Sequence, residues 1–107
     1  MEVDWSKVEK LFNKNLPESL EMAIIESEKI LKKVIEEKKI PGKTIDEKIE
    51  ALKPFLSNSD KLTYAQRIYK RILKESNFEL DQKETENVLQ AFYQAVSDLT
   101  GEEAVPI

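Results

Sequence analysis

The stretch PESLEMAIIESEKILKKVIEEKK, from Pro17 to Lys39, decides the fold class. Pro17 suits the first turn of a helix, where its missing N–H is not needed. The sequence IPGK, residues 40–43, then ends the helix, because proline restricts the residue before it and Gly42 permits a turn. Between these limits the apolar residues recur every three or four positions and form a wide stripe: Leu20, Ala23, Ile24, Ile30, Leu31, Val34 and Ile35.

Four further segments carry helical patterns. In DWSKVEKLFNK, residues 4–14, apolar residues recur at helical spacing, and Trp5 is predicted to pack against the bundle. Thr44 and Glu47 are spaced as a capping box at the start of a short third helix. The fourth helix is predicted from about residue 61 to about residue 75, after the loop SNSD at residues 57–60.

The last helix begins with a second predicted capping box, formed by Asp81 and Glu84, and ends near Gly101. No strand-like alternation runs long enough to indicate a sheet. The sequence therefore predicts an all-α, up-and-down bundle of about five helices. We expect residues 1–100 to form one domain and residues 101–107 to form a flexible C-terminal tail.

Composition excludes several kinds of chemistry. The 107 residues include no Cys and no His, and the formal net charge is −4. Disulfides, thiolate zinc sites and cysteine nucleophiles are therefore excluded, and the commonest general base is missing. The acidic residues are scattered beside lysines, so we predict no metal site and no cofactor. No window approaches the length of a membrane span, which predicts a soluble, cytoplasmic protein.

The predicted fourth helix has a basic side. At about 100° per residue, its apolar residues gather on one side: Leu62, Ala65, Ile68, Tyr69, Ile72 and Leu73. Four cations, which we call the cation row, gather on the opposite side: Arg67, Lys70, Arg71 and Lys74. The row is either an ordinary solvated face or a surface that contacts phosphates or an acidic partner.

Three features together resemble a known superfamily. They are the opening Trp segment, the long helix that continues into IPGKTIDEKI, and the order YAQRIYKRILKESNFEL followed by the last helix. Over roughly residues 5–99 this order resembles small bacterial and archaeal members of the HEPN-like helical-bundle superfamily. Catalytic members are metal-independent ribonucleases. Their motif is an Arg, a polar residue such as Asn, and a His a few positions later, located where two protomers meet.

The residues of that ribonuclease motif are replaced in this chain. In relatives with a comparable stretch the motif reads approximately HKIRNRIAHE. The Arg position falls on Tyr69, the Asn position on Lys70 and the His position on Lys74, while Arg71 matches the second Arg. RNA cleavage through the 2′-hydroxyl needs a base, and a lysine is a poor base at neutral pH unless it is strongly desolvated. The resemblance therefore implies a non-catalytic domain, because the residues that would catalyse RNA cleavage are replaced.

The resemblance also implies partners. Family members commonly pair through the helices that carry the motif, and they often act beside a nucleotidyltransferase-like protein or in defence and toxin–antitoxin systems. The first hypothesis is thus a homodimerising or partner-binding module. Its partly exposed apolar contacts would be Tyr69, Leu73, Tyr93 and Phe12, although ordinary core packing explains these residues too. The second hypothesis is an RNA- or nucleotide-binding module that uses the cation row. A divergent ribonuclease is the third.

Overall fold

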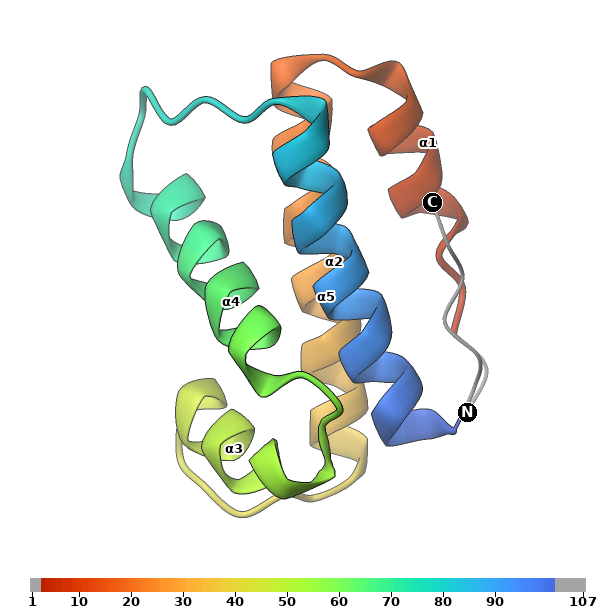
Figure 1. Ribbon diagram of the computed structural model, residues 1–107, viewed down its shortest axis with the longest axis vertical. Coiled ribbons are helices and arrows are strands. Elements are labelled where there is room, and N and C mark those ends of the chain that lie inside the picture. The colour runs from red at the N-terminus through yellow and green to blue at the C-terminus, as the bar shows by residue number, and fades with distance from the viewer. Residues whose placement is uncertain (1–2, 102–107) are drawn as a thin grey trace.

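The computed structural model describes residues 3–101 and confirms the all-α fold class. The described residues form five α-helices. Helices α1, α2, α4 and α5 run up and down the molecule, and α3 lies at its base (Figure 1). They are α1 (Ser6–Lys14), α2 (Pro17–Glu37), α3 (Ile45–Leu52), α4 (Ser59–Lys74) and α5 (Gln82–Thr100), and a 3-10 turn, η1 (Lys53–Phe55), follows α3. Within residues 3–101 there is no β-strand. No helix in this range has the length and apolar character needed to cross a membrane.

The ends of the helices follow local hydrogen bonds. At α3 the predicted capping box forms: the backbone N–H of Glu47 donates to Thr44 Oγ1 at 3.1 Å, and that of Thr44 donates to Glu47 Oε2 at 3.0 Å. At α5 only half of the predicted box forms. The N–H of Glu84 donates to Asp81 Oδ1 at 2.7 Å, but the Glu84 carboxylate accepts from the Tyr64 hydroxyl at 3.3 Å.

The end of α5 also matches the sequence-based expectation. Gly101 takes a left-handed conformation with φ of 78°, which a glycine adopts at little cost, and its N–H donates to the carbonyl of Ser97 at 2.8 Å. The predicted flexible tail begins at this residue. The remainder of that segment, residues 102–107, lies outside the described residues.

The core lies mainly between α2 and α5, the two longest helices, and α1 and α4 pack on either side of them (Figure 1). Trp5 joins α1 to α5, because its ring meets the ring of Tyr93 edge to face, with 4.1 Å between centroids and 81° between planes. Of the two explanations for Phe12 and Tyr93, ordinary core packing holds and partial exposure does not. Their exposed fractions are 6% and 2%, because both point into the core.

Candidate partner-binding site

The cation row lies on α4 and is partly neutralised by neighbouring carboxylates. Lys70 forms an ion pair with Asp46 of α3. The Nε of Arg71 donates to Glu75 Oε2 at 2.8 Å, and the guanidinium lies 4.4 Å from the centroid of the Phe78 ring. This hydrogen bond lowers the pKa of Glu75 and raises that of Arg71. Half of the row is therefore engaged within the chain.

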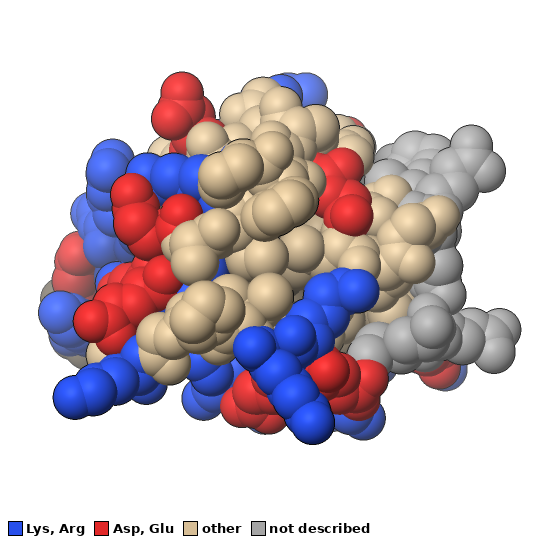
Figure 2. All heavy atoms as spheres, turned by 90° about the horizontal axis from the view of Figure 1, so that it is seen from below, with Lys and Arg blue, Asp and Glu red and all other residues tan. Residues whose placement is uncertain are grey.

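The other two cations of the row have no such partners. Within residues 3–101, Arg67 and Lys74 make no ion pair, and both side chains are exposed. The surface around α3 is not uniformly basic either. Viewed from the end where α3 lies, basic and acidic side chains stand next to one another around a largely uncharged centre (Figure 2). A continuous positive surface is absent from this view.

Tyr69, at the Arg position of the motif, faces a buried acid on α2. Its side chain is half-buried, and its phenol donates a hydrogen bond to the Glu28 carboxylate. Glu28 is only 4% exposed, and no Lys or Arg in the described part of the chain lies within ion-pair distance of it. Desolvation raises the pKa of Glu28, and the Tyr69 hydrogen bond and the charges of Lys32 and Lys29 oppose this increase.

Glu28 is a polar residue of the helix interface that none of the sequence-based expectations includes, although its spacing marks it. Glu28 follows Ile24 by four positions and precedes Leu31 by three, so it occupies a position within the apolar stripe of α2. A glutamate at such a position is rarely fully buried without a charged partner. That spacing could have marked it as a polar group in the helix interface.

Leu73 lies one turn beyond Tyr69 on α4 and is 58% exposed. The helical pattern groups Leu73 with the apolar residues of α4, but it is not part of the core. Its exposure agrees with the other expectation, that of a partly exposed apolar side chain. Leu62, Ala65 and Ile68 are buried as expected, but Leu73 lies near the end of α4, where the chain leaves for the loop over residues 75–80. We call Glu28, Tyr69 and Leu73 the α2–α4 edge.

A second unusual polar group lies one turn before Tyr69. Gln66 is 5% exposed, and neither atom of its side-chain amide has a hydrogen-bond partner. It contributes to the lining of a hollow of about 260 Å³ between α3 and α4, together with Asp46, Ile49, Arg67 and Lys70. Two buried polar side chains, Glu28 and Gln66, thus lie close to the degenerate motif.

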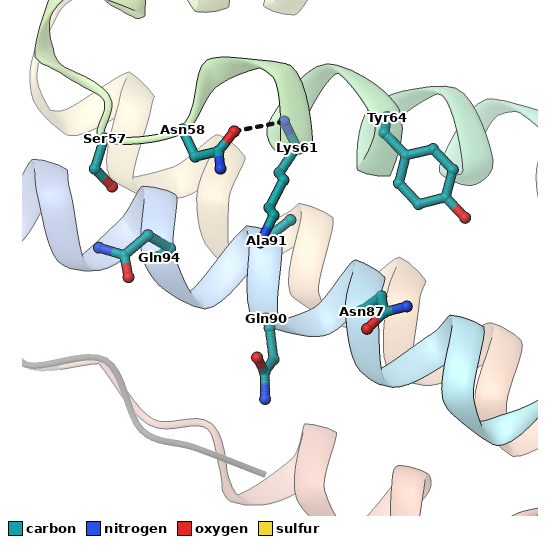
Figure 3. Close-up of a pocket in the computed structure, with 8 residues that line it drawn as sticks. All are labelled: Ser57, Asn58, Lys61, Tyr64, Asn87, Gln90, Ala91 and Gln94. Atoms are coloured by element: carbon teal, nitrogen blue, oxygen red, sulfur yellow. Dashed lines mark hydrogen bonds between the residues drawn. The ribbon is translucent and has the colours of Figure 1, made fainter.

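A larger groove, of about 570 Å³, lies on the other side of α4, between α4 and α5 (Figure 3). Most of its lining side chains are uncharged and polar, and carboxamides of Asn87, Gln90 and Gln94 project from α5 at helical spacing. The side chain of Lys61 extends from α4 toward Ala91 and crosses the groove. None of the motif positions contributes to this groove.

Two ionisable groups at or beside the α2–α4 edge are Lys74 and Glu28. Lys74, at the His position, is exposed, and an ammonium group has no lone pair with which to accept a proton. The carboxylate of Glu28 is covered and accepts from Tyr69, and that of Glu75, next to Lys74, pairs with Arg71. Among the described residues no three acidic side chains are grouped so that they could hold a metal ion.

Comparison of the chain with models of protein families, with curated proteins and with solved structures finds no match. The HEPN-like resemblance therefore depends on the sequence patterns of residues 5–99 alone.

Proposed function

We propose that this chain is a non-catalytic, HEPN-like helical module that binds a helical protein partner through the α2–α4 edge. The partner is a second copy or another helical protein, in a defence or toxin–antitoxin setting of the kind that the resemblance implies. The observation that carries the proposal is Leu73, a large apolar side chain that is 58% exposed beside the half-buried Tyr69. Tyrosine is enriched among the residues that carry most of the binding energy of interfaces, and the contacts around such an anchor exclude water from it.

Loss of catalysis follows from the same residues. A ribonuclease of this type needs a group that accepts a proton from the 2′-hydroxyl and a group that protonates the leaving oxygen. The chain has no His, and the motif positions carry Tyr69, Lys70 and Lys74 instead. Of these, Lys70 is held by Asp46 and Tyr69 by Glu28. Incubation of highly purified protein with RNA should leave the RNA intact.

An RNA- or nucleotide-binding module is the alternative function. Arg67 and Lys74 support it, because both are exposed and neither pairs with a carboxylate within residues 3–101. The ion pairs of Lys70 and Arg71 disfavour it, since RNA would have to compete with Asp46 and Glu75. If RNA changes the NMR chemical shifts of the backbone amides in the cation row, and if salt reverses the change, this alternative is favoured over partner binding.

The experiment that tests partner binding is a comparison of two exposed leucines. Leu73→Glu places a charge at the α2–α4 edge, and Leu16→Glu places the same charge at the turn between α1 and α2, where Leu16 is 56% exposed. We expect sedimentation velocity at high micromolar concentration to show a dimer for the natural chain and for Leu16→Glu, and a monomer for Leu73→Glu. A natural chain that stays monomeric would contradict self-pairing. If Leu73→Glu and Leu16→Glu dissociate the dimer equally, the interface does not lie specifically at the α2–α4 edge.

A further inference from the structure

The segment between α2 and α4 has few buried side chains that attach it to the rest of the molecule. Residues 38–56, which include α3 and η1, span as many positions as α5, yet they bury two side chains, Ile49 and Leu52, whereas α5 buries nine. Three more apolar side chains of the segment are partly buried against the core: Ile40, Ile45 and Leu56. An element with little buried apolar surface opens at a lower free energy than the core does.

Both ends of this segment are places where a movement can stop. After α2, the backbone takes positive φ at Lys39 (53°) and Gly42 (134°), and the chain turns toward α3 (Figure 1). At the other end, the N–H and the hydroxyl of Ser57 both donate to Asp98 Oδ2, at 2.8 and 2.9 Å. These bonds fix the chain to α5 just before α4 begins. Residues 38–56 can therefore move without displacing α2, α4 or α5.

The contact of α3 with α4 combines one ion pair with one unfavourable polar group. Asp46 pairs with Lys70 of α4, whereas the pair of Glu50 and Lys53, at 2.9 Å, lies within the segment itself. Beside the first pair, α3 and α4 line the hollow of about 260 Å³ to which Gln66 contributes, and the amide of Gln66 has no hydrogen-bond partner. Water could satisfy that amide once α3 moved away, so the buried amide favours opening and the ion pair opposes it.

We infer that residues 38–56 form a flap that opens away from α4 while the long helices keep their common core, with the pair of Asp46 and Lys70 as its latch. The open form is a minor state of the folded protein. Opening hydrates the Gln66 amide and separates Lys70 from the carboxylate that neutralises it, so the cation row then has Lys70 free beside Arg67. The inference does not rest on the proposed function, because no residue of the α2–α4 edge lines the hollow.

Hydrogen exchange of single backbone amides, followed by NMR in the folded protein, tests the flap. We expect the amides of residues 48–52 to exchange at least about tenfold faster than the slowest amides of α5. Their rates should also depend less on urea, because opening of the flap exposes less surface than global unfolding does. Equal rates with equal urea dependence would overturn the inference, since α3 would then be released only when the whole chain unfolds.

Lys70→Gln and Arg67→Gln form a matched pair of variants for the latch. Both cations line the hollow, but Arg67 makes no ion pair within residues 3–101. The latch breaks in the open form as well as in the unfolded chain, so Lys70→Gln should accelerate residues 48–52 and the slowest amides of α5 alike, about two- to fivefold. Arg67→Gln should accelerate neither. If Lys70→Gln leaves residues 48–52 unchanged, the pair survives the opening and the inference fails.

Two further variants show which contacts the opening breaks. Gln66→Met should slow residues 48–52 by the same factor as the slowest amides of α5, about fivefold, because it removes the amide that opening would hydrate. Val8→Ala weakens the core on α1, where Val8 is buried, and should accelerate only the slowest amides of α5, by at least about tenfold.

Either of two results with these variants would overturn the inference. If Gln66→Met slows α5 and not residues 48–52, the opening leaves Gln66 covered. If Val8→Ala accelerates residues 48–52 as much as α5, the opening is global unfolding. Circular dichroism checks that each variant folds, and Lys70→Gln still decides the matter if a core variant does not, because Lys70 is exposed on the surface.

Discussion

At the scale of single residues, the buried polar side chains are the most informative feature of this molecule. Among the described residues, five polar side chains of α2, α4 and α5 are buried: Ser19, Ser27, Glu28, Gln66 and Thr85. The three hydroxyl groups each donate to a backbone carbonyl. Buried polar groups are normally hydrogen-bonded, so each exception calls for an explanation. Glu28 accepts a hydrogen bond from Tyr69, and the charges of Lys32 and Lys29 act on its carboxylate. For Gln66 the consequence is a cost to the stability of the isolated chain.

Replacement of Gln66 by methionine should therefore stabilise the protein. Gln66→Met keeps the length of the side chain and removes two polar atoms that have no hydrogen-bond partner. We expect the free energy of unfolding, measured in urea, to increase by about 1 kcal/mol. The control is Gln90→Met on the exposed face of α5, which should change the value by less than about 0.5 kcal/mol. A loss of stability in Gln66→Met would show that the amide has a stabilising contact after all.

At the scale of elements, the ends of the helices depend on a few side chains. Asp81, Thr44 and Asn58 each accept a hydrogen bond from a backbone N–H in the first turn of the helix that follows. The N–H groups of a first turn have no partner within the helix, so these acceptors satisfy them. The cap at Thr44 has a further consequence, because α3 carries the Asp46 that neutralises part of the cation row.

Removal of the cap on α3 should weaken the fold without touching the core. Thr44→Ala deletes the hydroxyl that accepts from Glu47, and we expect it to reduce the free energy of unfolding by about 1 kcal/mol. Thr63→Ala is a matched change within α4, where the hydroxyl only donates to the carbonyl of Ser59 at 3.0 Å. That variant should remain within about 0.5 kcal/mol of the natural chain. Equal effects in thermal or urea unfolding would contradict a specific role of the cap.

At the scale of the whole molecule, one core connects all the long helices. Trp5, the single tryptophan of the chain, contacts Tyr93 of α5, while α5 also packs on α2 and α4. We therefore predict that unfolding is a single cooperative transition. Trp5 fluorescence, which reports on α1, and far-ultraviolet circular dichroism, which reports on all helices, should give the same urea midpoint. An earlier fluorescence transition would mean that α1 detaches first and that residues 1–100 do not unfold as one unit.

Much of the fold follows from local patterns, because helix period, proline and capping residues act over a few positions. The sequence predicts three such features, and the structure confirms them: the apolar stripe of α2, the capping box of Thr44 and Glu47, and the glycine that ends α5. The up-and-down order also follows, since short connections favour antiparallel neighbours.

Periodicity could not fix which side chains on a helical face are covered. The pattern groups Leu73 with the apolar residues of α4, but coverage depends on where a neighbouring helix ends, and the side chain is 58% exposed. In the same way, Phe12 is buried on α1, which packs on α2, and Tyr93 is buried on α5, where its ring contacts Trp5; no local pattern states either arrangement.

The sequence by itself thus determined the kind of structure, five amphipathic helices with their starts and stops, and the absence of imidazole and thiol chemistry. Only the tertiary structure decided the electrostatics. It placed Asp46 against Lys70 and Tyr69 over Glu28, whereas the pair of Arg71 and Glu75 is local, because these residues are four positions apart. The physical reason is distance: helix formation depends on neighbours three or four residues apart, whereas most of these pairings join different helices, and their strength depends on burial that only packing creates.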